Sequence, residues 1–304
     1  MRITYIHEFD MEKYTVIGGP TSENLAQKIS KKLDAKLLKA ELKTFPDGES
    51  KITVKGISKT KKSIVVQSTN PPVDTNLVHL LSLIYQARKI SSEVYAVIPY
   101  MGYAKQDKEF LKGEIITISV VAKLLKAAGA TRLIVVDIHS DEELDFFKMP
   151  SKNLSAVSLL ANYFKKIKLH QPLVVSPDLF WKNKAKEFAK ELNCDSIALN
   201  KQRNRKTGNL IIKSSKFPKT NFHDVILLDD MVSTGGSIVK AIEFLKKKNL
   251  GKIYVACTHA VLAGNAEKRI KKAGVNKIVS TNTISGKYSL VDLSEIISKI
   301  IQGW

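Results

Sequence analysis

Two adjacent acids and a glycine-rich loop lie within one stretch of this sequence, VILLDDMVSTGGSIVKAI. An apolar run ends in Asp229 and Asp230, and a short loop then leads into a helical pattern. Adjacent glycines let the backbone approach a ligand closely, and the first turn of a helix offers unpaired N–H groups to an anion. The residues that could hold a monophosphate here are Ser233, Thr234, Gly235, Gly236 and Ser237. A carboxylate cannot favour a phosphate, so we expect the two acids to accept hydrogen bonds from vicinal sugar hydroxyls.

The elements that must position this loop form an alternating series. Short Val- and Ile-rich runs without polar alternation predict parallel strands that are covered on both faces. The expected strands are Tyr14–Ile17, Ser63–Gln67, Val94–Pro99, Leu133–Asp137, Leu173–Ser176, Ser196–Leu199, Val225–Leu228, Ile253–Cys257 and Lys277–Ser280. The expected helices are Ser22–Leu33, Asn76–Lys89, Ile118–Ala127, Ser155–Lys166, Phe180–Glu191, Ser237–Lys248, Ala266–Lys272 and Leu293–Ile300. This alternation predicts an α/β fold with mostly parallel sheets flanked by helices.

A weak internal repeat divides the chain into two similar halves. SIVVQST, VYAVIPYMGY and RLIVVDIH in the first half match DVILLDDMVSTGGS, KIYVACTHAVLAG and KIVSTNTI in the second, in order and spacing. We therefore expect two similar domains, residues 1–150 and 151–304, with the boundary near Met149–Ser155. The first-half counterpart of the glycine-rich loop reads VVQSTNPPVDTN, with Gln67 in place of an acid and prolines in place of glycines. The sugar phosphate site is thus predicted in the second half alone.

Composition limits the classes of function. The chain has 304 residues, and 49 Lys and Arg against 29 Asp and Glu give a net charge of +20. Most of the excess is lysine at helical spacing and aromatic residues make up only 7%, so we expect no nucleic-acid partner. No apolar run approaches the roughly 18 residues of a membrane span, and MRITYIHEFD lacks the apolar core of a secretory signal. Cys194 and Cys257 form neither a disulfide scaffold nor a zinc cluster, which favours a reducing, cytoplasmic location.

Further motifs bear other chemistry. In DIHS and SPD, His139 and Asp178 follow strands, and a ring nitrogen and a carboxylate could hold a divalent cation together with water. His139 taken alone favours a hydrogen-bonded core histidine over a metal ligand, and TFPDGES taken alone is compatible with an ordinary tight turn. The sequence contains no G-x-x-x-x-G-K-[ST], so ATP chemistry of the P-loop type is excluded.

The DDMVSTGGS loop resembles the phosphoribosyl-binding pattern of type I phosphoribosyltransferase-like proteins. TFPDGES, PYMGYAKQDKEF, VVDIHS with VVSPD, and NKQRN extend the resemblance over nearly the whole chain, to the ribose-phosphate diphosphokinase (phosphoribosyl diphosphate synthase) family. The resemblance implies two phosphoribosyltransferase-like domains and the formation of phosphoribosyl diphosphate and AMP from ATP and ribose 5-phosphate. It also implies Mg²⁺ as cofactor and a homodimer or higher homo-oligomer.

The resemblance also assigns roles to individual residues. It implies ATP binding by Lys105, Gln106 and His139, and by Phe45, Asp47, Gly48 and Glu49 from a neighbouring subunit. His139 and Asp178 match the family's metal ligands. Lys201 and Arg203 match a catalytic Lys-x-Arg pair on a mobile flap, where cations could stabilise the charge of diphosphoryl transfer. Ribose 5-phosphate would lie on Arg203, Asp229, Asp230 and the loop Ser233, Thr234, Gly235, Gly236 and Ser237.

The chain departs from the family pattern at a few positions. Lys105 stands where the family usually has Arg, which keeps the charge but loses the planar fork of a guanidinium. Ser233 stands where many relatives carry a further Asp, and Lys148 and Lys152 stand where relatives often have acids.

Two other functions share part of this pattern. A phosphoribosyltransferase that consumes phosphoribosyl diphosphate and a base would use the same loop, but the chain length, the two halves and TFPDGES argue against it. A non-catalytic homologue, either a regulator of a synthase or a nucleotide-responsive DNA-binding protein, would be expected to lose the flap cations or the metal ligands. Those residues are all present, and no helix-turn-helix pattern precedes Tyr14.

Overall fold

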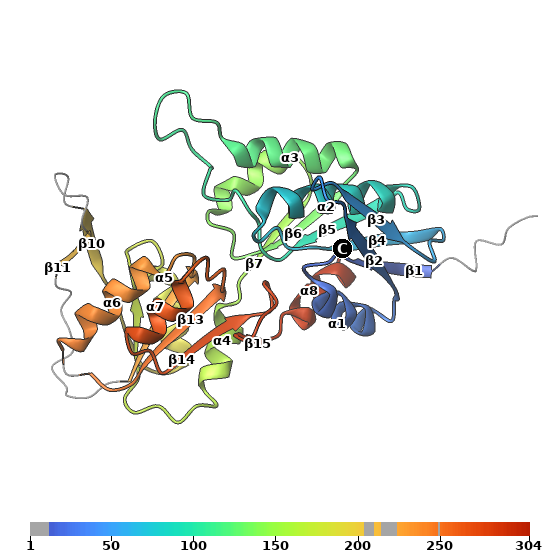
Figure 1. Cartoon of the computed structure of the whole chain (residues 1–304). Coiled ribbons are helices and arrows are strands. Elements are labelled where there is room, and N and C mark those ends of the chain that lie inside the picture. The colour runs from blue at the N-terminus through green and yellow to red at the C-terminus, as the bar shows by residue number, and fades with distance from the viewer. Residues whose placement is uncertain (1–11, 204–209, 214–223, 249) are drawn as a thin grey trace, which may run out of the picture. The chain divides into compact units, whose positions relative to one another are not determined.

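The chain forms two compact units, each with its own sheet, flanking helices and core (Figure 1). The computed structural model describes residues 12–203, 210–213, 224–248 and 250–304. The first unit runs to Leu154 and also includes Ser294–Trp304 at the end of the chain. The second unit is Ser155–Leu293.

A 7-stranded sheet forms the centre of the first unit, in the order β3-β2-β1-β4-β5-β6-β7. Its strands are β1 (Glu12–Gly18), β2 (Lys36–Thr44), β3 (Ser50–Val54), β4 (Thr60–Val66), β5 (Glu93–Ile98), β6 (Arg132–Val136) and β7 (Ser151–Leu154). Every pairing is parallel except the β2–β3 hairpin. Residues of β4, β5 and β6 are buried almost throughout, as expected for strands with helices on both faces.

Helices cover both faces of this sheet. They are α1 (Glu23–Leu33), α2 (Val73–Arg88), α3 (Thr117–Ala128), the short 3₁₀ helix η2 (Asp141–Phe147) and α8 (Ser294–Gln302). The crossovers β1–α1–β2 and β4–α2–β5 run in opposite directions along the sheet, so right-handed connections place α1 and α2 on opposite faces. Accordingly α1 packs with α8 on one face and α2 packs with α3 on the other (Figure 1).

The second unit contains a 6-stranded, fully parallel sheet in the order β15-β14-β13-β12-β8-β9. Its strands are β8 (Leu173–Ser176), β9 (Asp195–Ala198), β12 (Val225–Met231), β13 (Ile253–His259), β14 (Lys277–Thr281) and β15 (Ser289–Val291). Its helices are α4 (Val157–Phe164), α5 (Lys182–Glu191), α6 (Gly236–Lys246) and α7 (Ala266–Lys272). A separate antiparallel pair, β10 (Asn200–Arg203) and β11 (Leu210–Lys213), lies between β9 and β12 in the sequence.

The two sheets have the same strand plan. The spatial order β2-β1-β4-β5-β6-β7 of the first corresponds to β9-β8-β12-β13-β14-β15 of the second, with helices in matching places. In each unit a hairpin lies between the first crossover and the central strand: β2–β3 in one and β10–β11 in the other. The internal repeat that the sequence indicates is therefore a repeat of whole domains.

The α/β fold with mostly parallel sheets is confirmed, and every expected strand and helix is present with ends shifted by a few residues. The sequence interpretation overlooked β2, β3, β7, β10, β11 and β15. All of them except β2 are short, and they lie at sheet edges or in hairpins. β2, β3 and β7 mix polar with apolar residues, so they lack the continuous apolar run that marks a central strand. Within the described residues, no helix is both long and apolar enough to cross a membrane.

The end of the chain belongs to the first unit, although the expected second domain extended from 151 to 304. Ile297 and Ile301 on the apolar face of α8 are fully buried, and α8 packs against α1. Glu295 forms an ion pair with Lys32 of α1 at 2.5 Å, and the Trp304 ring lies 5.9 Å from that of Tyr95. β7 also pairs with β6 of the first sheet, which moves the boundary to Leu154. Tertiary packing, which no local signal in the sequence marks, sets both limits.

Candidate active site

The two predicted sugar-binding acids lie at the carboxyl end of β12, in the middle of the second sheet. Asp229 is 9% exposed and Asp230 is 6% exposed. The Asp230 N–H donates to Asp229 Oδ1 at 3.1 Å, and the Met231 N–H donates to Asp230 Oδ1 at 2.7 Å. These bonds fix both carboxylates at the edge of the sheet where open α/β folds bind ligands.

Cys257 of β13 stands in register with Asp229. Burial raises the pKa of this thiol above its ordinary value, and the charges of Asp229 and Asp230 raise it further. The side chain therefore remains a neutral thiol. Because the thiolate is the nucleophilic form of cysteine, Cys257 serves packing beside the acids and not chemistry.

The adjacent glycines of the loop have different structural requirements. Gly235 has a φ of +74°, and a Cβ there would meet Ile270 Cδ1 at 3.0 Å and Ala266 Cβ at 3.4 Å, so the fold itself needs glycine. At Gly236 a Cβ would meet no atom of the described residues closer than 3.9 Å, so their packing places no such demand on this residue. The space above Gly236, at the first residue of α6, is open to a ligand.

Hydroxyl groups line the same loop. Thr234 is exposed, and Ser233 and Ser237 are half-buried. Within the part of the chain that the structure describes, none of these hydroxyls makes a hydrogen bond. Together with the N–H groups at the start of α6, they are the donors that a phosphate dianion needs.

A second loop, which follows β13, holds the first in place. The Val232 N–H donates to His259 O at 2.9 Å, the Leu262 N–H donates to Val232 O at 2.8 Å, and the Ala263 N–H donates to Ser233 O at 3.1 Å. Leu262 has a φ of +47°, an unusual conformation for a branched residue. The sequence interpretation missed this support, because only the parallel pairing of β12 with β13 brings the two loops together.

Arg269 of α7 is a further residue that the interpretation missed. Its Nη1 donates to Thr234 O at 3.4 Å, and its Nη2 is 3.9 Å from the position that a Cβ on Gly236 would take. In the sequence it lies within AEKRIKK, which has the composition of a solvated basic helix face, so no local signal distinguishes it.

Asp178, the predicted metal ligand of this unit, follows the end of β8, the strand beside β12. Its Oδ1 accepts the Phe180 N–H at 3.1 Å, and its backbone carbonyl accepts the Ser176 hydroxyl at 2.6 Å. Because β8 and β12 are parallel neighbours, Asp178 and the two acids of β12 share the carboxyl edge of one sheet.

In the first unit, the predicted ATP-binding residues Lys105 and Gln106 lie on the loop between β5 and α3, and both are exposed. The preceding Tyr103 has a φ of +66°, and its hydroxyl hydrogen-bonds to Asp74 of α2. This bond and burial raise the pKa of the Tyr103 phenol. The Gln106 N–H donates to Tyr103 O at 2.8 Å, so the turn that carries Lys105 is anchored at both ends.

His139 follows β6, the parallel neighbour of β5. The residue is half-buried, so its ring is not part of the hydrophobic core. The loop before it is fixed by the Asp137 N–H, which donates to Leu154 O at 2.8 Å, and by the Ile138 N–H, which donates to Asn153 Oδ1 at 3.1 Å. His139 therefore shares the carboxyl edge of the first sheet with the loop of Lys105 and Gln106.

Phe45, Asp47, Gly48 and Glu49 form the tip of the β2–β3 hairpin. The Gly48 N–H donates to Phe45 O at 3.0 Å, and the Glu49 N–H donates to Asp47 Oδ1 at 3.1 Å. The turn expected from Pro-Asp-Gly is thus present, with Asp47 and Glu49 exposed. Because β1 and β4 separate β2 from β5, this tip and the Lys105 loop follow strands that are not neighbours.

Lys201 and Arg203 lie on β10 of the β10–β11 hairpin, but their side chains are outside the described residues. The structure thus brings the predicted residues together in two sets, one at the carboxyl edge of each sheet. The second-unit set comprises Asp178, Asp229, Asp230 and the loop 233–237, and the first-unit set comprises Lys105, Gln106 and His139.

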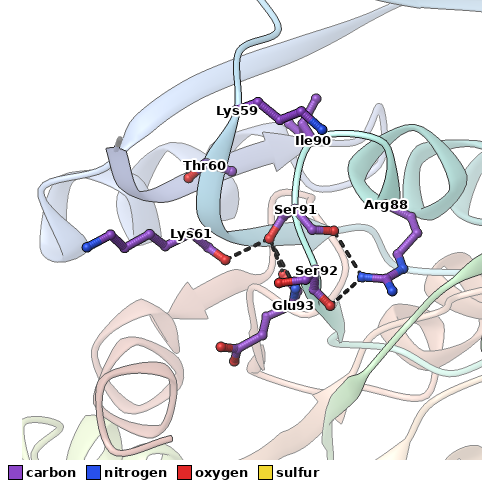
Figure 2. Close-up of a pocket in the computed structure, with 8 residues that line it drawn as sticks. All are labelled: Lys59, Thr60, Lys61, Arg88, Ile90, Ser91, Ser92 and Glu93. Carbon is purple, nitrogen blue, oxygen red and sulfur yellow. Dashed lines mark hydrogen bonds between the residues drawn. The ribbon is translucent and has the colours of Figure 1, made fainter. Parts of the chain in front are cut away.

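A cavity of about 660 Å³ lies in the first unit at the amino ends of β4 and β5, whereas Lys105, Gln106 and His139 follow the carboxyl ends of strands of this sheet (Figure 2). Some of its polar groups bond to one another. Arg88 Nη1 donates to Ser91 O at 3.1 Å and also bonds to Ser92 O, and the Ser91 hydroxyl donates to Lys61 O at 2.8 Å. No predicted site residue lines this cavity.

Comparison with known proteins finds a family match in each half of the chain. Residues 14–129 match the N-terminal domain of ribose phosphate pyrophosphokinase, and residues 211–302 match the phosphoribosyl synthetase-associated domain. The ribose-phosphate pyrophosphokinase of Methanobrevibacter smithii is 36% identical over 297 residues, which are 94% of this chain and 99% of that protein. The chain belongs to the ribose-phosphate pyrophosphokinase family.

Further relatives agree with this family. The ribose-phosphate pyrophosphokinase of Sulfolobus acidocaldarius is 34% identical over 290 residues, which are 94% of this chain and 99% of that protein. The crystal structure of phosphoribosylpyrophosphate synthetase from Mycobacterium smegmatis superimposes with a TM-score of 0.81 at 26% identity, covering 96% of this chain and 98% of that one. The family and the phosphoribosyltransferase-like fold expected from the motifs are thus confirmed.

Proposed function

We propose that this ribose-phosphate pyrophosphokinase transfers the diphosphoryl group of ATP to the 1-hydroxyl of ribose 5-phosphate, giving phosphoribosyl diphosphate and AMP. The observation that carries the proposal is the β12–α6 loop, whose hydroxyls make no hydrogen bond within the described chain and which directly follows two buried acids. Such a loop offers N–H and O–H donors to a phosphate and carboxylate acceptors to sugar hydroxyls.

The sugar phosphate would bind to the second unit. Its 5-phosphate would accept hydrogen bonds from the backbone N–H groups of 233–237 and from the hydroxyls of Ser233, Thr234 and Ser237. Its 2- and 3-hydroxyls would donate to Asp229 and Asp230. This arrangement holds the 1-hydroxyl in a fixed direction, and positioning of that kind can supply a large part of a rate enhancement.

The reaction itself is an in-line displacement at phosphorus. The 1-hydroxyl oxygen forms a bond to the β-phosphorus of ATP, and the bond from that phosphorus to the oxygen shared with the α-phosphate breaks. AMP leaves with that oxygen, and the proton of the attacking hydroxyl is released to solvent. Negative charge gathers on the transferred group, so fixed cations lower the barrier.

The ATP side of the reaction would use the first unit. Lys105 can contact a phosphate as a point charge, and Gln106 can hydrogen-bond to the nucleotide. The Phe45 ring can stack on a purine, while Asp47 or Glu49 accepts from its exocyclic amine, with Gly48 leaving space beside them. Since this hairpin tip and the Lys105 loop do not follow neighbouring strands, we assign the tip to the ATP site of a second copy of the chain in a homodimer or larger assembly.

Mg²⁺ would accompany the nucleotide. Among the described residues, no group of three or more His, Cys, Asp or Glu side chains is close enough to hold a metal. That arrangement fits a cation that takes most of its ligands from phosphate oxygens and water. Asp178, with its carboxylate oriented by the Phe180 N–H, and His139 would supply the protein ligands. When bound, the ion would neutralise charge on the phosphates.

Lys201 and Arg203 would supply the cations of the transition state. Both are carried by the β10–β11 hairpin, which occupies the same place in the second unit as the β2–β3 hairpin does in the first. Cations on such an element can approach the reacting phosphates after both substrates have bound.

The test is direct incubation of the purified full chain with MgATP and ribose 5-phosphate. We expect AMP and phosphoribosyl diphosphate to form in equal amounts, and chromatography measures both products over time. The double variant Asp229→Asn with Asp230→Asn should lose at least about a hundredfold in kcat/KM for ribose 5-phosphate, which corresponds to about 2.7 kcal/mol. Asp195→Asn, an exposed acid of β9, should behave like the parent protein.

The alternative functions give different products in the same assay. A phosphoribosyltransferase would release diphosphate from phosphoribosyl diphosphate and a purine, and would make no AMP from ATP and ribose 5-phosphate. A regulatory homologue would turn over neither mixture. Either result from folded protein would overturn the proposed function.

A further inference from the structure

Arg269 is positioned at the sugar phosphate loop by helix packing. Ala266 and Ile270 of α7 lie against Gly235, where a Cβ would meet them at 3.4 Å and 3.0 Å. Residues three and four apart share one face of a helix, so Arg269, three residues after Ala266, is turned toward the same loop. Its Nη1 lies 3.4 Å from Thr234 O. Its Nη2 lies 3.9 Å from the position that a Cβ on Gly236 would take, so the guanidinium borders the space at Gly236.

No acid of the described residues neutralises the guanidinium of Arg269. Arg269 forms no ion pair within the described residues. The nearest acid along its own helix, Glu267, is engaged by Lys287 at 2.6 Å and by Lys271 at 3.0 Å. Hydrogen bonds from these two lysines lower the pKa of Glu267 to about 2, which is consistent with a carboxylate committed to them. Arg269 thus keeps a full positive charge beside the loop.

The guanidinium of Arg269 retains donor groups that could bind a phosphate. Four of the five guanidinium N–H groups are not used by the bond to Thr234 O. The planar fork matches two oxygens of a phosphate, and its charge offsets the repulsion between that phosphate and the nearby carbonyl of Thr234. An isolated basic residue on a helix face would show neither the contact with the loop carbonyl nor the approach to Gly236.

We propose that Arg269 is a substrate-binding residue, whose guanidinium bridges Thr234 O and an oxygen of the 5-phosphate of the sugar substrate. The proposal rests on the proposed function, because it requires a sugar phosphate in the β12–α6 loop. It adds to the backbone cradle a charged contact from a separate helix.

The experiment measures ribose 5-phosphate binding by calorimetry without nucleotide, and steady-state kinetics at saturating MgATP. Arg269→Gln should raise the Kd and the KM for ribose 5-phosphate by about tenfold or more, with little change in kcat or in the KM for ATP. Arg269→Lys should recover part of the affinity, since it keeps the charge but not the fork. Arg269 is exposed and makes one long hydrogen bond, so the variants should fold, which melting curves check.

The matched control is Lys268→Gln, which removes one positive charge from an exposed neighbour on the same helix. It should leave the Kd for ribose 5-phosphate within about twofold of the parent value. An equal loss of affinity for ribose 5-phosphate in Arg269→Gln and Lys268→Gln would show a general effect of positive charge and would overturn the proposed contact. An unchanged Kd in Arg269→Gln, or a fall in its kcat alone, would also overturn it. If the parent protein binds no ribose 5-phosphate, the proposed function fails as well. If the parent binds it and Gly236→Ala weakens binding but Arg269→Gln does not, this inference alone fails.

Discussion

The β4–α2 loop of the first unit and the β12–α6 loop of the second occupy equivalent places in two copies of one fold, but only the second is open. In the first unit, Gln67 is fully buried and its Oε1 accepts the Thr21 N–H at 3.2 Å. A Cβ on Gly19 would lie 2.0 Å from that oxygen, so the amide fills the space above the neighbouring β1–α1 loop. In the second unit, a Cβ on Gly236 would meet no atom closer than 3.9 Å in the part of the chain that the structure describes.

The hydroxyls of the two loops differ in the same way. In the first unit, Ser68 Oγ accepts the Tyr100 N–H at 3.1 Å, Thr69 Oγ1 accepts the Gly102 N–H at 2.7 Å, and Thr21 Oγ1 donates to Ser68 O at 2.7 Å. In the second unit, Ser233, Thr234 and Ser237 make no such bonds within the described chain. One copy of the fold thus uses its loop groups to hold itself together, and the other keeps them for a ligand.

The largest expected effect concerns the two hairpins. Lys201→Ala on β10 should lower kcat by about a thousandfold with little change in either KM, because a cation that acts in the transition state is removed. Lys39→Ala on β2, an exposed lysine of the first sheet just before the β2–β3 hairpin, should retain the kcat of the parent protein. Steady-state kinetics on both variants decides the point. A near-normal kcat in Lys201→Ala would refute the catalytic role of the flap.

Gly235 and Gly236 of the β12–α6 loop should respond differently to substitution. Gly236→Ala should raise the KM for ribose 5-phosphate by about ten- to a hundredfold while thermal stability stays level, because the new methyl group enters only the ligand's space. Gly235→Ala should instead lower the free energy of unfolding by about 2 kcal/mol, since the residue has a positive φ and contacts Ile270. Kinetics and melting curves separate the two effects. Equal stability losses in both variants would contradict the assignment of Gly236 to ligand binding.

A smaller effect is expected at the β2–β3 hairpin tip. Phe45→Ala should raise the KM for ATP by up to about tenfold with little change in the KM for ribose 5-phosphate, because stacking on an adenine contributes about 0.5–1.5 kcal/mol. Mixing Phe45→Ala with His139→Ala subunits should restore activity above either variant alone if the tip serves a neighbouring chain. No gain on mixing would place the tip and His139 in one chain's site.

The smallest expected effect tests the buried polar groups of the first unit. His79 of α2 is 3% exposed, and neither ring nitrogen has a hydrogen-bond partner among the described residues. Burial lowers the pKa of this imidazole. The neutral ring is therefore the folded form. Stability should be constant above the unfolded pKa of about 6.5 and should fall by up to about 1.4 kcal/mol for each pH unit below it. His79→Leu should remove this slope in denaturant titrations, whereas His170→Gln, an exposed histidine, should retain it.

Much of the architecture could be predicted from local sequence. Central strands such as β5 and β12 are continuous apolar runs because both of their faces are covered, and α1 and α6 follow helical periodicity. Edge and hairpin strands such as β3 and β7 could not be recognised, because their exposed faces carry polar residues. The membership of α8 in the first unit depends on packing against α1, which is far away in the sequence.

The candidate site, like the fold, could be predicted only in part from local sequence. The paired acids, the glycine-rich loop and the Lys201 and Arg203 pair could be predicted from local sequence, since these are contiguous motifs whose residue types suit phosphate and sugar groups. Three properties came from the three-dimensional structure: which glycine the fold needs, which loop hydroxyls make no hydrogen bond within the described residues, and that Arg269 lies beside the loop. These properties depend on contacts between segments that parallel strand pairing brings together, and residues far apart in the sequence leave no local pattern of such contacts.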